Sequence, residues 1–388
     1  MTMRRPVMLG AVVAAIGVGL LIGIIAANTT APSPSMAPPV AGVPSSSAAS
    51  PSPSPSPALT PSPTPVPTPT PEPTPVLVAD PLTGLAVSPE VAMRRPIAVM
   101  IDDLTPARPQ SGLSDASVVW HAEAEGGIPR YMAIFHHTLP KEIGPVRSAR
   151  SYYIGWASEW KATYAHAGGS PQALATLRAK GAGQLVWNAE VFRWEGRFFH
   201  RNPARYAPHD VYTSGKELRT LGRRLGAEDR ELKAAWRFAP DAPLEARPYG
   251  GTISVSYPAN RITYHYHRAT NTYRRSVTGE SRQVDAGNHE RVAPKNVVVM
   301  LMHFVPLNDG SSKKRLEATF IGSGRAWIST NGRTIKGTWK KAGMSRPTRF
   351  FDADGNRVVL TAGQTFVQVL RTGSPVTIHK GSDTPPAS

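Results

Sequence analysis

The sequence predicts an α+β fold, in which an N-terminal α/β-type domain with a mixed sheet precedes a smaller antiparallel β-rich domain. Within residues 80–247, short buried-strand patterns alternate with helix-length segments. Within residues 248–372, strand patterns follow one another and are separated by turn signals such as Asn331-Gly332. An apolar run and a proline-rich segment come before both domains, so the prediction adds a single N-terminal transmembrane helix and a disordered stalk.

The transmembrane anchor is predicted within residues 1–27. Residues 6–27 are uncharged and apolar over about the length needed to cross a bilayer. Arg4 and Arg5 precede the run and favour a cytoplasmic N-terminus. The run is longer than the apolar region of most signal peptides, so we expect an uncleaved anchor, although the small residues Ala26 and Ala27 leave cleavage open. In both cases the bulk of the chain is exported, and with the uncleaved anchor the protein is a single-pass protein of the cell membrane whose C-terminal domains lie outside the cytoplasm.

Two further segments lack the apolar periodicity from which a core is built. Residues 28–79 consist almost entirely of Pro, Ser, Thr and Ala, which predicts a disordered polyproline-type stalk. At about 3.1 Å per residue, such a stalk holds a domain on the order of 100 Å from the membrane. Residues 373–388 are predicted to form a disordered tail.

Composition restricts the partners. The chain carries 44 Lys and Arg against 27 Asp and Glu, a formal net charge of +17. Because the globular part is exported, we expect cell-wall or lipid-linked anionic glycans, or an envelope protein, and no nucleic acid. Cysteine is absent, which excludes disulfides, thiolate metal sites, a cysteine nucleophile and a lipidated cysteine.

The first domain contains three strand patterns, at residues 96–101, 117–122 and 131–136. The first ends in the pair Asp102 and Asp103, and acidic residues at the carboxyl ends of strands commonly line a site in α/β folds. A fourth strand, within 161–167, leads through a glycine turn into a helix at about 172–180 with Ser170 as its N-cap. Another helix is expected at about 215–225.

Arginines cluster between residues 144 and 171. Arg147 and Arg150 precede a helical pattern at 152–160, and backbone N–H groups at a helix start favour anions. Two guanidinium groups bind phosphate or carboxylate bidentately, so this segment predicts an anion site, with Arg108 and His209 as further ligands. Structural salt bridges of the same arginines remain an open alternative.

The second domain is predicted from strand patterns between residues 253 and 370. Four of its aromatic residues could form a carbohydrate-stacking platform, but cross-strand packing is the favoured interpretation of aromatics at strand positions. The four residues are Tyr264, Tyr266, Trp327 and Trp339.

Several longer motifs resemble those of the YerB-like family of bacterial exported proteins. In the first domain these are DPLTGL, RRPIAVMID, ARPQSGLSDA, EGGIPR, IGPVRSARS, HAGGSPQAL and APHDVYTS, and in the second GTWKK, TRFFDADG and GQTFVQVL. The resemblance covers residues 80–370 and implies export and two domains, but no reaction. Many members of the family look like lipoproteins, whereas this chain lacks the cysteine that lipidation requires.

A second, weaker similarity is to LytR-CpsA-Psr phosphotransferases, which move glycopolymers from polyprenyl-pyrophosphate carriers to the cell wall. It rests on the order of three features: Arg108 with Asp115, then Arg147 with Arg150, then the turn AHAGGSP. For such a reaction, Asp102 and Asp115 are the candidate ligands of a divalent cation such as Mg²⁺. The candidates for the general base, which takes the proton from the acceptor hydroxyl, are Glu125 and His166.

Two functions therefore remain open. One is a non-catalytic envelope protein that binds an anionic ligand, a cell-wall polymer or a protein partner, and we rank it first because binding requires fewer residues than catalysis. The other is the phosphotransferase. The motifs GxSxG, HExxH, GxGxxG and the P-loop are all absent, so the sequence does not decide whether the protein is an enzyme.

Overall fold

The computed structural model describes residues 76–385. The predicted anchor, residues 28–75 of the predicted stalk and the last three residues lie outside the described residues. Among the described residues, no helix has the length and apolar composition needed to cross a bilayer. The described chain is α+β and mostly strands, as the sequence predicts.

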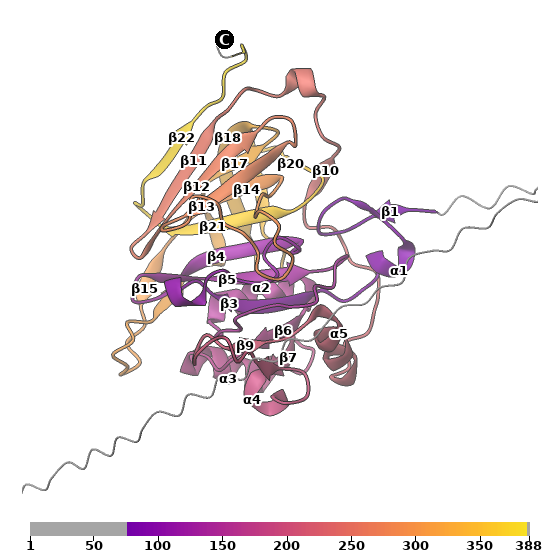
Figure 1. Ribbon diagram of the computed structural model, residues 1–388, viewed down its shortest axis with the longest axis vertical. Coiled ribbons are helices and arrows are strands. Elements are labelled where there is room, and N and C mark those ends of the chain that lie inside the picture. The colour runs from indigo at the N-terminus through magenta and orange to yellow at the C-terminus, as the bar shows by residue number, and fades with distance from the viewer. Residues whose placement is uncertain (1–75, 386–388) are drawn as a thin grey trace, which may run out of the picture. The chain divides into compact units, whose positions relative to one another are not determined.

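A ten-stranded mixed sheet is the centre of the fold (Figure 1). In spatial order its strands are β19 (Arg349–Phe351), β18 (Arg333–Lys341), β17 (Gly322–Thr330), β14 (Asn296–Met302), β21 (Thr365–Arg371), β4 (Val118–Glu125), β5 (Ile128–Phe135), β3 (Ile97–Asp102), β6 (Thr163–His166) and β7 (Trp187–Glu190). The predicted strands of the first domain are thus confirmed as β3, β4, β5 and β6. Strand β3 is buried along its whole length, which explains its nearly continuous apolar sequence.

The sheet continues from the first predicted domain into the second. Strand β21 pairs in parallel with β4, with Thr365 opposite Val118, and Figure 1 shows yellow β21 beside purple β4. Strand β21 is also parallel to β14 on its other side. The predicted all-antiparallel pattern of the second domain is therefore wrong at β21, which enters the sheet between a strand of each domain.

A second sheet contains four antiparallel strands, in the order β13 (Thr272–Val277), β12 (Asn260–His267), β11 (Thr252–Tyr257) and β22 (Val376–His379). Strand β22 corrects the prediction of a disordered tail from residue 373, because residues 376–379 pair with β11. Four pairs of short strands complete the sheets: β1 (Val78–Ala79) with β2 (Ala86–Val87), β8 (His200–Arg201) with β9 (Val211–Tyr212), β10 (Arg237–Ala239) with β20 (Val359–Thr361), and β15 (Phe304–Pro306) with β16 (Leu316–Ala318). Strand β1 shows that ordered structure begins before residue 80, where the stalk was predicted to end.

Helices and the second sheet cover the two faces of the large sheet. The helices are α1 (Pro89–Ala92), α2 (Ser151–Ala157), α3 (Pro171–Lys180), α4 (Val191–Trp194) and α5 (Gly215–Arg224), with 3-10 turns η1 (Thr105–Ala107), η2 (Ser158–Trp160) and η3 (Leu244–Ala246). Ser170 accepts a hydrogen bond from the backbone of Ala173, so the predicted N-cap of α3 is confirmed.

Each face has its own apolar core. On one face Trp156 of α2 stacks on Trp120 of β4, with ring centroids 4.4 Å apart. On the other face lie α5 and the four-stranded sheet, where Tyr264 packs edge-on against Phe366 of β21. Tyr264 and Trp339 are fully buried, so for them the favoured interpretation, cross-strand packing rather than a carbohydrate platform, is confirmed.

Candidate functional site

Charged residues gather at one edge of the large sheet, because seven of its strands run in the same direction. At this edge β3 ends in Asp102, β4 in Glu125, β6 in His166, β7 in Glu190 and β21 in Arg371. The carboxyl ends of parallel strands are the usual place for ligand sites in α/β sheets. The sequence pattern that places a polar residue directly after each apolar strand therefore marks this edge.

Asp102 is the centre of a cluster at this edge. Its carboxylate is almost fully buried, and Oδ2 lies 2.9 Å from Nε of Arg147 and 2.8 Å from Nδ1 of His209. The Arg147 segment is held beside β3 because the backbone N–H of Arg147 donates to the carbonyl of Met100 at 2.8 Å. Three predicted site residues, far apart in sequence, are thus in direct contact.

Arg147 presents its guanidinium group outward from this cluster. Its Nε–H is not aligned with Asp102, so the contact is an ion pair rather than a hydrogen bond. Neither terminal nitrogen donates a hydrogen bond to a residue that the structure describes, and the side chain is 22% exposed. Nε2 of His209 also lacks a partner among these residues. A fixed fork beside an imidazole nitrogen is suited to a phosphate or carboxylate.

Arg108 is predicted as an anion ligand, but the structure gives it two protein partners. Nη2 lies 3.2 Å from the carboxylate of Asp103, and Nη1 donates to the carbonyl of Thr278 at 2.7 Å. Its side chain is almost fully buried. Arg108 therefore joins the loop after β3 to the turn after β13, and it has little surface left for a ligand.

Asp103 belongs to a buried polar network between the two sheets, which the sequence did not predict. Its carboxylate accepts hydrogen bonds from Tyr131 (2.9 Å) and Asn260 (2.7 Å) and lies 3.0 Å from Nε2 of His121. Burial raises the pKa of Asp103, but the contact with His121 and the charge of Arg108 lower it by more, so it lies below its ordinary value. The only sequence signal was the paired Asp102-Asp103 at a strand end.

Arg150 forms a buried ion pair, and this corrects its predicted role in anion binding. Its guanidinium is 2% exposed and pairs with Glu125, which also pairs with Arg130. Burial lowers the pKa of Arg150 to about 10, and the charge of Arg130 adds to this shift. Arg150 therefore fits the alternative that the sequence left open, a structural salt bridge.

The same ion pairs argue against Glu125 as a general base. Burial raises the pKa of Glu125, but the charges of Arg130 and Arg150 lower it by more, so the pKa lies below its ordinary value. A carboxylate stabilised in its charged form is a weak proton acceptor at neutral pH.

His166 does not reach a ligand either. It is fully buried, with Nδ1 2.8 Å from the carbonyl of Gly168 and Nε2 2.7 Å from the side chain of Asn188. Burial lowers its pKa, against the opposing effect of these two hydrogen bonds. His166 fixes the turn before α3 and does not present a free nitrogen to an acceptor hydroxyl.

The two predicted metal ligands are not brought together. Asp115 lies in the loop before β4, where burial raises its pKa and the charge of Asp285 raises it further. It shares no hydrogen-bond partner with Asp102. Within residues 76–385, no group of three His, Asp or Glu residues is placed to hold a metal ion. The structure therefore gives the predicted Mg²⁺ site no ligand set.

Comparisons with known proteins agree with this architecture. Two family models match, described as the N-terminal domain (residues 82–228) and the C-terminal domain (residues 253–367) of "Protein of unknown function (DUF3048)". The protein described as "Putative lipoprotein YerB" of Bacillus subtilis (strain 168) is 30% identical over 308 residues, which is 78% of this chain and 88% of that protein. This chain belongs to the YerB-like, DUF3048 family.

The crystal structure of the Bacillus subtilis YerB protein has a similar fold. It matches with a TM-score of 0.69 and 26% sequence identity, over 78% of this chain and all of that chain. In this YerB-like protein, Asp102, Arg147 and His209 all lie in the segment matched by the N-terminal family model, whereas β22 lies beyond the segment matched by the C-terminal model.

The loop between β7 and β9 adds an exposed basic surface to the YerB-like site, which the sequence reasoning missed. Tyr206 is 64% exposed and packs edge-on against His209, with ring centroids 5.6 Å apart. Arg205 anchors the loop by donating to the carbonyl of Arg108 at 2.9 Å. Between β7 and β9, residues 191–210 contain four arginines against Glu195 and Asp210, a net charge of +2, and this local excess was the available signal.

Proposed function

We propose that this protein binds an anionic group, a phosphate or carboxylate of a cell-wall polymer or of an envelope partner, at the cluster of Asp102, Arg147 and His209. The observation that carries the proposal is the outward guanidinium fork of Arg147, which is fixed by Asp102 and whose terminal nitrogens have no hydrogen-bond partner within residues 76–385. Because the fork is already ordered, an anion that binds it loses little affinity to side-chain ordering.

The proposed location of the protein is supported by a relative and by the N-terminal sequence. The similar Bacillus subtilis protein is described as "Putative lipoprotein YerB". This chain has no cysteine to carry a lipid, and we propose that residues 6–27 anchor it instead, so that the two sheets lie outside the cytoplasm. The basic loop after β7 then faces the anionic polymers of the envelope and raises their local concentration near Arg147.

Phosphotransfer from a polyprenyl-pyrophosphate carrier is the second candidate function, and one observation favours it. Nδ1 of His209 lies against Asp102 while Nε2 has no partner in the part of the chain that the structure describes, which is the arrangement of an imidazole held to accept a proton through Nε2. In this candidate His209 takes the role predicted for Glu125 or His166, and Arg147 neutralises charge on the pyrophosphate. Arg150 has no part in it.

In the test, full-length protein in detergent is titrated with inorganic pyrophosphate, and isothermal titration calorimetry measures the affinity. We expect Arg147→Gln to lower the affinity about tenfold or more, and Arg147→Lys to lower it less, because a point charge replaces the fork. The matched control is Arg178→Gln, an exposed arginine on α3. Equal affinity of the wild type and Arg147→Gln would remove the proposed site.

A second measurement separates binding from transfer. Wild-type protein purified from membranes is examined for bound polyprenyl phosphates by mass spectrometry, and its turnover of a lipid-pyrophosphate glycan is measured. The phosphotransferase predicts that His209→Asn retains pyrophosphate binding and loses turnover. If the wild-type protein binds pyrophosphate but carries no polyprenyl lipid and transfers no glycan, its function is binding and not transfer.

A further inference from the structure

The four-stranded sheet has an apolar inner face and a polar outer face. Side chains alternate along each strand, so that Ile253, Val255 and Tyr257 of β11 point inward and are buried, while Ser254 and Ser256 point outward. The outward side chains of the four strands are all partly or fully exposed. They are Thr252, Ser254, Ser256, Arg261, Thr263, His265, His267, Thr272, Arg274, Ser276, Thr377 and His379, and together they are defined here as the outer face.

The outer face contains hydroxyl groups and basic groups only. None of the four strands contains an Asp or Glu residue. Exposed sheet surfaces normally mix charges of both signs, because opposite charges across neighbouring strands stabilise a sheet and like charges oppose it. Here His265 lies directly opposite Arg274 with no acidic neighbour on the four strands. No acidic side chain on the four strands offsets the positive charge of the outer face.

Register aligns these groups in rows across the strands. Thr377, Ser254, Thr263 and Ser276 are paired in succession, and they form a row of hydroxyl groups over all four strands. The adjacent row contains His379, Thr252, His265 and Arg274. With three interstrand spacings of about 4.8 Å, each row is about 14 Å long. The outer face is thus a strip of hydroxyl groups with arginine and histidine side chains beside it.

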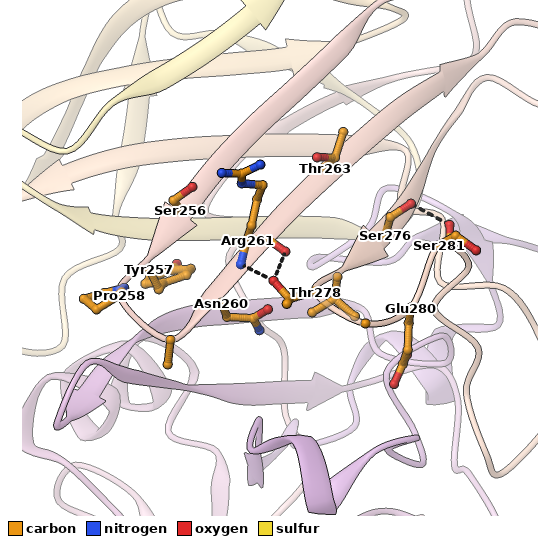
Figure 2. A pocket seen from close by; sticks show the side chains of 13 residues that line it. Ser256, Tyr257, Pro258, Asn260, Arg261, Thr263, Ser276, Thr278, Glu280 and Ser281 are labelled. Atoms are coloured by element: carbon orange, nitrogen blue, oxygen red, sulfur yellow. Dashed lines mark hydrogen bonds between the residues drawn. The ribbon is translucent and has the colours of Figure 1, made fainter.

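A cavity of about 670 Å³ opens at one end of this strip (Figure 2). Arg261, Thr263 and Ser276 line it, and Figure 2 shows them on the side of the outer face. The single carboxylate of the cavity is that of Glu280. Figure 2 shows its side chain directed away from the hydroxyl row, toward the first-domain strands. Burial raises the pKa of Glu280, and the charges of Arg108 and Arg275 oppose this shift.

We propose that the outer face binds an extended phosphodiester polymer, of the polyol-phosphate kind, laid across the four strands with its end in this cavity. Charge complementarity selects a polyanion, and the hydroxyl row supplies hydrogen bonds to phosphate oxygens and to the hydroxyls of the polyol. The outer face has no apolar side chain to enter a bilayer and no Phe, Tyr or Trp ring on which a nucleic-acid base stacks, because its only rings are the imidazoles of His265, His267 and His379. The surface is distinct from the cluster at Asp102 and does not depend on its function.

The test is the binding of full-length protein in detergent to a synthetic poly(glycerol phosphate) of about ten repeats. We expect Arg261→Glu with Arg274→Glu to lower the affinity about tenfold or more at low salt, with a smaller loss in high salt because screening weakens the wild-type attraction. The charge-matched control is Arg178→Glu with Arg223→Glu on α3 and α5, which should change the affinity less than threefold.

A second variant separates hydroxyl contacts from charge. Thr263→Val with Thr377→Val retains the shape and the high strand propensity while removing two hydroxyls of the row, and a severalfold loss of polymer affinity is expected with an unchanged melting temperature. The Arg261→Glu, Arg274→Glu variant should keep the wild-type affinity for inorganic pyrophosphate at the Asp102, Arg147 and His209 cluster, so that this proposal and the proposed function fail separately.

Three outcomes overturn the proposal. One is equal affinity of the wild type and the Arg261, Arg274 variant. Another is an equal loss in the control pair on α3 and α5, which would show an effect of net charge alone. The third is a parallel loss of binding to vesicles of anionic lipid or to single-stranded DNA, which would show a surface without selectivity for the polymer.

Discussion

Nδ1 of His209 lies 2.8 Å from Oδ2 of Asp102, although 107 residues separate them in the chain. Asp102 ends a central strand and His209 precedes β9, so their contact fixes the loop after β7 to the edge of the sheet. Arg147 joins the same carboxylate from a third segment. The candidate site is therefore held by one buried acidic group shared between three parts of the chain.

The substitution Asp102→Asn tests this shared group. The amide keeps the shape but loses the charge that faces Arg147 and His209, and we expect the free energy of unfolding to fall by about 1–3 kcal/mol. Urea denaturation checks the value, with Asp354→Asn at an exposed turn as the control. A variant as stable as the wild type would mean that the three segments are held together by other contacts.

A buried ion pair joins the segments matched by the two family models. Nζ of Lys341 lies 2.8 Å from the carboxylate of Glu159, and both side chains are fully buried. Burial raises the pKa of Glu159 and lowers that of Lys341, because it disfavours both charges. We expect Lys341→Met alone to cost about 3–5 kcal/mol of unfolding free energy, since it leaves Glu159 buried without its partner.

The double substitution Lys341→Met with Glu159→Gln should recover part of this loss, as a double-mutant cycle from urea denaturation measures. The control is the exposed pair Arg333 and Asp383, where Arg333→Gln should change stability by less than about 0.5 kcal/mol. Additive losses in the cycle would contradict a coupled pair.

Stability should fall as the pH is lowered below about 6.5. The pKa of His166 is lowered in the folded protein, so between the folded and unfolded pKa values the unfolded chain binds the additional proton. The stability contributed by neutral His166 is complete above the unfolded pKa and is lost as the pH falls toward the folded value. The slope is at most about 1.4 kcal/mol per pH unit for one such group.

The measurement is the free energy of unfolding between pH 5 and pH 8 for the wild type and for His166→Gln. The variant should have a flatter profile whatever its absolute stability, whereas the exposed control His200→Gln should follow the wild-type slope. Parallel profiles of wild type and His166→Gln would contradict the assignment.

Ending the chain at Gly373 should destabilise the four-stranded sheet. The truncation removes β22, which pairs with β11 over four residues and packs Val376 and Ile378 against the core. We expect a loss of about 2 kcal/mol or more, together with self-association through the exposed edge of β11. Urea denaturation and sedimentation measure these effects, and a chain that ends at Pro385 is the control. Unchanged stability after removal of β22 would show that the strand adds nothing to the fold.

Local sequence determined the strands and helices of this protein. A short apolar run rich in β-branched residues, such as residues 97–101, favours a buried strand, because its side chains leave water and its backbone pairs with neighbouring strands. Ser170 and Pro171 begin α3 because a serine oxygen satisfies a free N–H and proline needs none. These effects act over a few residues and can be read from neighbours in the chain. The family motifs were equally local.

Only the tertiary structure decided which strands pair and which charged groups stay accessible. Alternation in β21 defines its two faces but not its neighbours, so its parallel pairing with β4 of the other segment could not be predicted. Arg147 and Arg150 differ by three positions and have the same chemistry. One keeps an open guanidinium fork and the other is buried against Glu125, because the exposure of a side chain depends on what distant segments pack around it.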